Sequence, residues 1–274
     1  MDYLRSLFKV EDKVVVITGG SGILGTEMAR GLLKAGARVV LLARNEENLR
    51  KKMSELTKIG PPLLGFHCDV TIETDLRHAN DEILSKFGRI DVLINAAGGN
   101  VPGATIGLDQ SVFDIEISEF HKVTDINLNG TVLSSLVFGK SIAHEKKGSI
   151  INLSSMASYR AITRVVGYSA AKAAIDNFTR WMAVEMALKF GDGIRVNAIA
   201  PGFLLTEQNR TLLTKKDGSL TERGKTIINM TPFKRLGEPD ELIGTVLWLA
   251  SDASKFVTGT IIPVDGGFSA FSGV

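Results

Sequence analysis

The stretch KVVVITGGSGILGTEMARGLLKAG, residues 13–36, decides the fold. Its β-branched run at 13–18 predicts a strand, and the apolar positions that follow the glycine cluster recur at helical spacing. Gly20, Gly22 and Gly25 have the spacing GxGxxG between a strand and a helix, as a dinucleotide-binding turn requires. Glycines let the backbone approach a pyrophosphate, whose charge the amides at the helix start stabilise. The stretch therefore predicts a strand, turn and helix that bind a dinucleotide, with a ligand-free glycine turn as the alternative.

Six further short apolar runs, each ending in polar or small residues, predict the other strands of a sheet. They cover residues 37–44, 62–70, 89–98, 148–155, 194–202 and 260–267. Helical patterns lie between most of them, and strands that alternate with helices form parallel sheets with right-handed crossovers. No linker, repeat or low-complexity segment divides the chain. The sequence therefore predicts one α/β domain over residues 1–274, a doubly wound parallel sheet of about seven strands with helices on both faces.

The composition excludes several classes of protein. The chain has 274 residues, a mass of 29.5 kDa and 44% hydrophobic residues, which is enough for a substantial core. Its net charge is +2 and charged residues are spread along the sequence, so there is no basic stripe for a nucleic acid. Cys68 is the single cysteine, which excludes an intramolecular disulfide and fits a reducing compartment. Without a signal peptide or an apolar run of ~18 residues, we expect a soluble cytoplasmic protein with no membrane partner.

The end of the strand at 37–44 indicates which dinucleotide is bound. A carboxylate at this place accepts hydrogen bonds from the adenosine ribose of NAD, whereas a nearby arginine accommodates the 2′-phosphate of NADP. This chain has Ala43 and Arg44 here. The sequence therefore favours NADP, with NAD as the alternative if Arg44 is solvated and Glu46 or Glu47 reaches back to the ribose.

Tyr168 and Lys172 lie four residues apart in the Ala-rich stretch YSAAKAAIDNFTRWMAVEM. Its apolar positions predict a helix, on which this spacing brings both side chains to one face. A free tyrosine has a pKa near ~10, and an adjacent cation favours the phenolate and lowers that value. Such a tyrosine could exchange a proton with an alcohol or ketone. Taken alone, the pair is equally compatible with an ordinary half-buried helix residue.

Several motifs together resemble one family. They are TG at 18–19 with the glycine turn, NAAG at 95–98, Asn127, Ser155, YSAAK at 168–172 and PGFLLT at 201–206. In this combination the chain resembles the short-chain dehydrogenase/reductase family, from about Asp12 to Phe268. The resemblance implies a Rossmann-type fold and an NAD(P)-dependent oxidoreductase that interconverts a ketone and a secondary alcohol. The turn departs from the family pattern TGxxxGxG, because Ile23 stands where its second glycine falls.

The resemblance implies a role for four residues. Tyr168 would exchange the proton with the substrate, and Ser155 would hydrogen-bond the same oxygen. Ser155 precedes Tyr168 by thirteen residues, the usual spacing in the family, and this favours it over Ser154. Lys172 would lower the pKa of the tyrosine and contact the nicotinamide ribose, and Asn127 would hold a water of the proton relay. Without the resemblance, Asn127 would be interpreted as a polar residue that bends a helix.

The resemblance also implies the cofactor contacts. The glycine turn would hold the pyrophosphate, the residues after the third strand the adenine, the NAAG motif the adenosine ribose and the PGFLLT motif the carboxamide. The expected contacts are Gly19, Gly20, Ser21, Gly22, Ile23, Leu24, Arg44, Asp69, Val70, Asn95, Ala96, Gly98, Tyr168, Lys172, Pro201, Gly202 and Thr206. We expect no metal site.

Two long segments should shape the substrate pocket, because strand ends carry the ligand crevice in open α/β sheets. They are an insertion near 99–120 and a lid near 203–232 that is rich in basic residues; long loops without structure of their own are usually functional. An arginine facing a small pocket can bind a carboxylate in a bidentate manner, although a solvated charged lid is the simpler interpretation. We expect substrate contacts from Asn100, Ser155, Arg160, Thr163 and Arg164.

The lid segments TEQNRTLL and DGSLTERG, with Arg160 and Arg164, resemble the D-mannonate oxidoreductase subgroup of the family, also called fructuronate reductases. This resemblance implies a sugar-acid substrate, D-fructuronate or D-mannonate, and the family implies a homotetramer. The alternatives are a gluconate 5-dehydrogenase-like enzyme, a 3-oxoacyl thioester reductase and, from another class, a dinucleotide-sensing binding protein that has lost the chemistry.

Overall fold

Seven parallel strands form one sheet in the computed structural model, which describes residues 2–60, 63–107 and 109–273. The strand order is β3-β2-β1-β4-β5-β6-β7. The strands are β1 (Val14–Thr18), β2 (Arg38–Ala43), β3 (Leu63–His67), β4 (Val92–Asn95), β5 (Gly148–Leu153), β6 (Ile194–Pro201) and β7 (Ile261–Val264). This confirms the predicted doubly wound parallel sheet. Pro62 of the third predicted strand, Leu108 of the predicted insertion and the terminal residues 1 and 274 lie outside the described residues.

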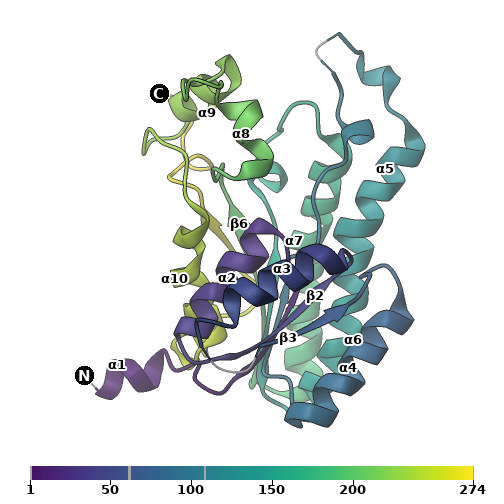
Figure 1. Ribbon diagram of the computed structural model, residues 1–274, viewed down its shortest axis with the longest axis vertical. Helices are drawn as coiled ribbons and strands as arrows, with labels where there is room; N and C mark the ends of the chain where they lie inside the picture. Colours follow the sequence, from purple (N-terminus) through teal and green to yellow (C-terminus); the bar gives the residue numbers. More distant parts are fainter. Residues whose placement is uncertain (1, 61–62, 108, 274) are drawn as a thin grey trace.

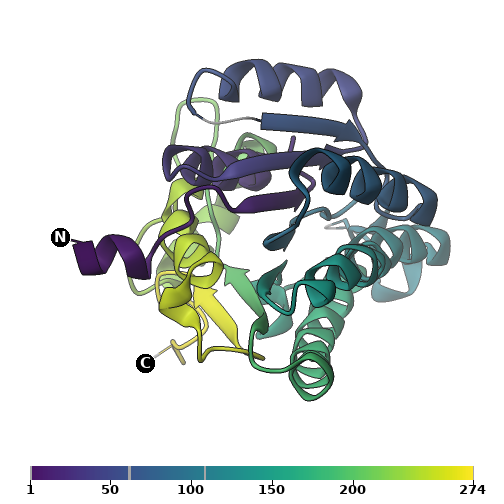
Figure 2. The ribbon, with the colours of Figure 1, turned by 90° about the horizontal axis from the view of Figure 1, so that it is seen from below.

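Helices cover both faces of this sheet (Figure 1 and Figure 2). The α-helices are α1 (Asp2–Leu7), α2 (Ile23–Lys34), α3 (Glu46–Leu56), α4 (Glu73–Phe87), α5 (Ile117–Thr124), α6 (Gly130–His144), α7 (Val166–Phe190), α8 (Glu207–Leu213), α9 (Glu222–Met230) and α10 (Ile243–Ala250). Helices α2, α3 and α10 pack with Val15 and Ile17 of β1, whereas α4, α6 and α7 pack with Val14 and Val16. The side chains of β1 thus alternate between two apolar cores, as the pleat of a buried strand requires.

Helix α1 lies apart from these layers, at the side of the molecule in both views (Figure 1 and Figure 2). Within the described ranges, no helix is both long enough and apolar enough to cross a membrane.

The strand order fixes where a ligand can bind. Strand β1 lies between β2 and β4, so the chain runs outward to β3 on one side and to β7 on the other. In open α/β sheets the ligand crevice lies outside the carboxyl ends of the strands at such a switch point. The glycine turn follows β1, the NAAG motif follows β4 and Ser155 follows β5, so all three meet at this end of the sheet.

Both predicted substrate segments contain helices of their own. The insertion holds two short 3₁₀ helices, η1 (Pro102–Ala104) and η2 (Val112–Asp114), before α5, and the lid holds α8 and α9. In Figure 1, α8 and α9 lie at the upper left and α5 at the upper right, beyond the same end of the sheet. Thr221 caps α9 by accepting a hydrogen bond from the Gly224 amide at 3.1 Å. The lid is therefore an ordered helical unit, whereas its length suggested a loop.

Candidate active site

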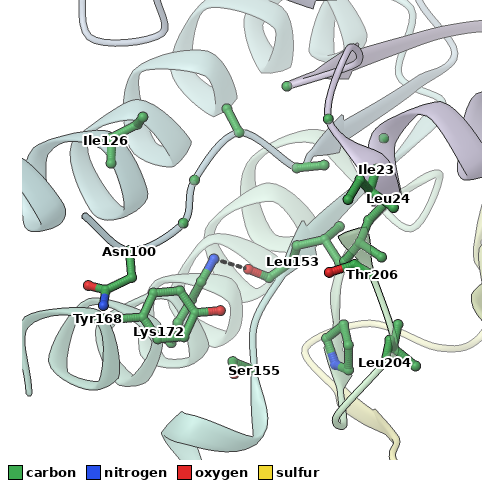
Figure 3. A pocket seen from close by; sticks show the side chains of 18 of the residues that line it. Ile23, Leu24, Asn100, Ile126, Leu153, Ser155, Tyr168, Lys172, Leu204 and Thr206 are labelled. Carbon is green, nitrogen blue, oxygen red and sulfur yellow. Dashed lines mark hydrogen bonds between the residues drawn. The ribbon is translucent and has the colours of Figure 1, made fainter. Parts of the chain in front are cut away.

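Tyr168 and Lys172 lie in the first two turns of α7, which confirms the helix predicted for this stretch. Lys172 is only 4% exposed, and its Nζ donates a hydrogen bond to the Leu153 carbonyl at 2.7 Å. The same Nζ lies 5.5 Å from the centre of the Tyr168 ring. Figure 3 shows the two side chains next to each other, with the lysine reaching back to the end of β5. The helical spacing therefore brings the phenol and the ammonium together as predicted.

The two serines that follow β5 have different partners. The Ser155 hydroxyl lowers the pKa of Tyr168, beside which it lines the cavity, and accepts a hydrogen bond from the Ala157 amide at 3.2 Å. Ser154 is buried, and its hydroxyl donates to the Asp176 carboxylate. The geometry thus separates the serine beside the tyrosine from its neighbour, in agreement with the thirteen-residue spacing.

Burial dominates the electrostatics of this pair. It raises the pKa of Tyr168 above its ordinary value, and the Ser155 hydroxyl opposes that change. It also lowers the pKa of Lys172 to about 8, although the nearby Asp176 carboxylate favours the charged form. We predicted a tyrosine pKa lowered by the lysine. The structure gives the opposite direction, because burial disfavours the charged form of both groups.

Asn127 lies in a wide turn of π-helix, η3 (Asp125–Asn129), between α5 and α6. Its amide nitrogen donates to the carbonyls of Val123 at 2.8 Å and Gly99 at 2.7 Å, and its oxygen accepts from the Gly99 amide at 3.0 Å. The side chain therefore fixes the loop after β4 against the helices, beside the lysine: a β-carbon added at Gly98 would lie 3.6 Å from Lys172 Nζ. Turns of this kind often mark functional sites.

A cavity of about 650 Å³ extends from the glycine turn to Tyr168 and Lys172 (Figure 3). The predicted cofactor residues that line it are Gly19, Ser21, Gly22, Ile23, Leu24, Arg44, Asp69, Val70, Ala96, Gly98, Tyr168, Lys172, Pro201, Gly202 and Thr206. Two predicted residues do not line it. Gly20 packs against Leu41, and Asn95 is buried with its amide donating to Ser135 and Asn152 at 2.8 Å each. Asn95 thus supports the wall of the cavity from behind.

The glycine turn leaves room for a ligand only because it lacks side chains. Gly19 has a φ of +64°, a conformation that L side chains rarely adopt, and a β-carbon there would lie 2.7 Å from Ala97 Cα. A β-carbon at Gly25 would lie 2.4 Å from the Gly19 carbonyl oxygen. Helix α2 starts at Ile23 directly after this turn. The amides at the helix start therefore have no acceptor within the helix and are free to donate hydrogen bonds to a ligand. Such a cradle fits the pyrophosphate of a dinucleotide.

The adenosine end of the cavity contains the residues that should distinguish NADP from NAD. Arg44 is 69% exposed and its guanidinium lies 3.7 Å from the Asp69 carboxylate. Against the effect of burial, hydrogen bonds from Thr71 and then Arg44 lower the pKa of Asp69. Glu46 pairs instead with Arg50, one helical turn later, at 2.6 Å. The carboxylate of Glu46 therefore points along α3 and not back to the end of β2.

The substrate residues predicted between Ser155 and Tyr168 lie outside the cavity lining. Arg160 donates to the main-chain carbonyls of Ser269 and Phe271 at 2.6 and 3.2 Å. Arg164 donates to the Ile106 carbonyl at 2.6 Å, and Thr163 is exposed. These placements differ from our prediction because main-chain carbonyls of the tail and the insertion already engage both guanidinium groups. From this stretch the cavity is lined by the apolar residues Met156, Ala157, Ile162 and Val165, and from the insertion by Asn100.

Arg223 of α9 is the basic residue of the lid that lines the same cavity as Tyr168 and Ser155. Burial lowers the pKa of its guanidinium, and the like charge of Arg164 adds to the effect. Among the described residues, no hydrogen bond or ion pair satisfies this half-buried group. The sequence placed Arg223 in a basic lid, but its position in the cavity depends on how α8 and α9 fold back over the sheet.

Comparison with known proteins defines the class of this chain. A family model described as enoyl-(acyl carrier protein) reductase matches residues 20–269. The chain belongs to the short-chain dehydrogenase/reductase family, as its motifs predicted, and is an oxidoreductase. A binding protein that has lost the chemistry is therefore not supported.

Three relatives cover nearly the whole chain. An uncharacterized oxidoreductase UxuB of Bacillus subtilis is 47% identical over 271 residues, with 96% of each chain covered. The 2-dehydro-3-deoxy-D-gluconate 5-dehydrogenase of Formosa agariphila is 34% identical over 268 residues, with 97% of this chain and 96% of its own covered. A crystal structure described as "a putative D-mannonate oxidoreductase" from Haemophilus influenzae with bound NAD has a TM-score of 0.90 at 39% identity, covering 97% of this chain and 98% of its own.

The residues of the cavity fit the nicotinamide cofactor that the family implies. The fit rests on the glycine cradle and on a cavity that joins it to Tyr168 and Lys172 without interruption. Where the chain is described, no group of three or more His, Cys, Asp or Glu side chains could hold a metal ion.

Proposed function

We propose that this oxidoreductase interconverts a ketone and a secondary alcohol on a sugar acid, with D-fructuronate and D-mannonate as the pair. The observation that carries the proposal is Arg223, a half-buried guanidinium that lines the cavity and has no partner among the described residues. A carboxylate bound there would relieve the repulsion between Arg223 and Arg164 and would form two parallel hydrogen bonds. The names of two relatives, "a putative D-mannonate oxidoreductase" and a 2-dehydro-3-deoxy-D-gluconate 5-dehydrogenase, support a sugar acid.

The nicotinamide, when bound, supplies or accepts the hydride. Tyr168 would exchange the proton with the substrate oxygen, because its phenol lines the cavity next to Ser155 and Lys172. Ser155 would donate to the same oxygen, since one acceptor position of its hydroxyl is already used by the Ala157 amide. Lys172 would favour the phenolate and hold the cofactor ribose, and Asn127 would keep the loop at Gly99 and a relay water in place.

The proposed cofactor is NADP, with NAD as the alternative. The proposal rests on Ala43 and Arg44 at the end of β2, where neither Glu46 nor Glu47 lines the cavity. The alternative rests on the Asp69 carboxylate, which competes for the Arg44 guanidinium, and on the relative with 39% identity, which holds NAD.

We further propose a homotetramer, in line with the family. Exposed apolar side chains on α6 and α7 support it: Leu136, Trp181, Val184 and Leu188 are between 54% and 78% exposed. Helices α6 and α7 contact each other, and several exposed apolar side chains on neighbouring helices are typical of a subunit contact. Light scattering should give four times the chain mass, and Leu188→Asp should lower it.

The substrate proposal is tested with two lid variants and two sugars. Arg223→Gln should raise the KM for D-fructuronate about tenfold or more, the effect of a lost hydrogen bond to a charged group. It should leave reduction of D-fructose, which lacks the carboxylate, nearly unchanged. Arg210→Gln is the matched control, because Arg210 is an exposed lid arginine outside the cavity lining. Equal effects on both sugars would contradict the proposal.

The alternatives are tested with the same protein. Turnover of 5-keto-D-gluconate in preference to D-fructuronate would support the gluconate 5-dehydrogenase-like activity. Turnover of an acetoacetyl thioester alone would remove the sugar acid altogether.

A further inference from the structure

Asp176 is a buried carboxylate that the proposed chemistry does not use. It lies on α7, one turn after Lys172 and two turns after Tyr168, and is 6% exposed. Its Oδ1 accepts a hydrogen bond from the Ser154 hydroxyl. Within the described part of the chain, no lysine or arginine nitrogen lies within 4.0 Å of it. A buried charge without an ion pair destabilises a fold, so packing alone would favour an apolar residue here.

The partners of Asp176 lead to the catalytic serine. The Ser154 hydroxyl also lies 3.2 Å from that of Ser158, whose Oγ donates to the Ser155 carbonyl at 2.7 Å. The Ser158 amide donates to the same carbonyl at 3.0 Å. The turn that presents Ser155 is thus tied to α7 through Ser154 and Asp176.

The charges around Asp176 show which group it affects. Lys172 is the neighbouring cation, whose charged form Asp176 favours against burial. Tyr159, at the end of the 3₁₀ helix η4 (Met156–Ser158), is the other titratable neighbour; Arg180 and Asp265 act on it with opposite signs. The Tyr159 hydroxyl donates to the Ile261 carbonyl at 3.0 Å, and Arg180 is exposed.

We propose that Asp176 is a positioning residue for the reaction, which supplies the counter-charge for Lys172 and, through Ser154, holds the turn that carries Ser155. The two roles are separable. The charge acts on Lys172 one helical turn away, and the hydrogen bond acts on Ser154. The inference rests on the oxidoreductase chemistry of the family and not on the sugar-acid proposal.

Two variants separate the roles. Asp176→Asn removes the charge but keeps an oxygen that can accept from Ser154. Ser154→Ala removes the hydrogen bond but keeps the charge. Asp91→Asn is the matched control, because Asp91 is a partly buried aspartate at the opposite end of the sheet, where it accepts from the Val14 amide at 2.8 Å. Asp176→Glu keeps the charge and tests for rescue.

The readout is the titration of Lys172, which needs no substrate. For each protein, the free energy of unfolding is measured against pH by denaturant-induced unfolding, and the same is done after adding Lys172→Met to that protein. The difference between the two curves gives the titration of Lys172. Asp176→Asn should move the midpoint of this titration to lower pH by about one unit, the effect of an opposite charge within a helical turn. Ser154→Ala, Asp91→Asn and Asp176→Glu should leave the midpoint unchanged.

Kinetics provide the second readout, with whichever of the four ketones named above the enzyme reduces. The alkaline limb of the kcat/KM profile should move to lower pH in Asp176→Asn, whereas Ser154→Ala should lower kcat at every pH without moving the limb. If Asp176 had only a structural role, Asp176→Asn and Ser154→Ala would both lower stability. Neither would move the Lys172 titration midpoint or the alkaline limb of kcat/KM. An unchanged Lys172 midpoint in Asp176→Asn would overturn the proposal, whatever the substrate is.

Discussion

Burying Lys172 should lower the free energy of unfolding at neutral pH, although the proposed chemistry needs this lysine. The structure buries the ammonium, whose one hydrogen bond to the described residues goes to the Leu153 carbonyl at 2.7 Å. Burial lowers the pKa of Lys172 from 10.5 to about 8. At roughly 1.4 kcal/mol per pKa unit, the fold disfavours the charged lysine by about 3 kcal/mol. Replacement by Met, which has a similar length and no charge, removes this cost.

The sign follows from the number of bound protons. Between pH 8 and 10.5 the unfolded chain holds the lysine proton and the folded chain does not, so the wild-type protein gains stability as pH rises through this window. Lys172→Met has no such gain. Its stability relative to wild type should therefore fall by about 3 kcal/mol between pH 7 and pH 10.5. The Leu153 carbonyl loses its donor in the variant, which costs roughly 1–3 kcal/mol at every pH and leaves the pH dependence intact.

The assay is denaturant-induced unfolding of both proteins at several pH values, at one protein concentration and without nucleotide, because a ligand that binds the folded state would add its own stabilisation. The difference between the two free energies of unfolding cancels the titration of all other groups. A difference that stays constant from pH 7 to pH 10.5 would refute the buried, easily deprotonated lysine. Turnover by Lys172→Met should be lost throughout.

Three further changes test other parts of the site. Arg44→Asp should weaken binding of NADPH about tenfold or more and of NADH much less, as measured by nucleotide fluorescence; equal losses would contradict the phosphate assignment. Gly25→Ala should weaken both nucleotides strongly, because the added carbon lies 2.4 Å from the Gly19 carbonyl; unchanged binding would show that the cradle can move. Asn127→Ala should lower kcat more than it raises the KM for nucleotide, since the loop at Gly99 loses both of its side-chain hydrogen bonds; an unchanged kcat would remove its positioning role.

The sequence was sufficient to predict the sheet because its signals are local. Residues 14–18 are β-branched and all buried, and the glycine turn after them is packed too closely for side chains at Gly19, Gly20 and Gly25. The spacing of Tyr168 and Lys172 predicted their contact because a helix fixes side chains four residues apart. These features depend on neighbours along the chain and not on the tertiary arrangement.

The remaining features depend on distant parts of the chain. The direction of the tyrosine pKa was mispredicted because burial, the largest influence on that pKa, is a property of the packed site. The sequence could not show that Arg223 lines the cavity and Arg160 does not. The carbonyls of Ser269 and Phe271, which accept hydrogen bonds from Arg160, lie more than a hundred residues away along the chain. Asp176 gave no signal, because its hydrogen-bond partner Ser154 comes from another element.

The central claim is that Tyr168 moves the proton of a sugar acid in this cavity. Nicotinamide absorbance with D-fructuronate, followed for the wild-type protein and for Tyr168→Phe, tests it most directly. We expect wild-type turnover and a loss of about a hundredfold or more in Tyr168→Phe, with nucleotide affinity unchanged. Undiminished turnover by Tyr168→Phe would contradict the proposed chemistry, and absence of turnover by the wild-type protein would contradict the proposed substrate.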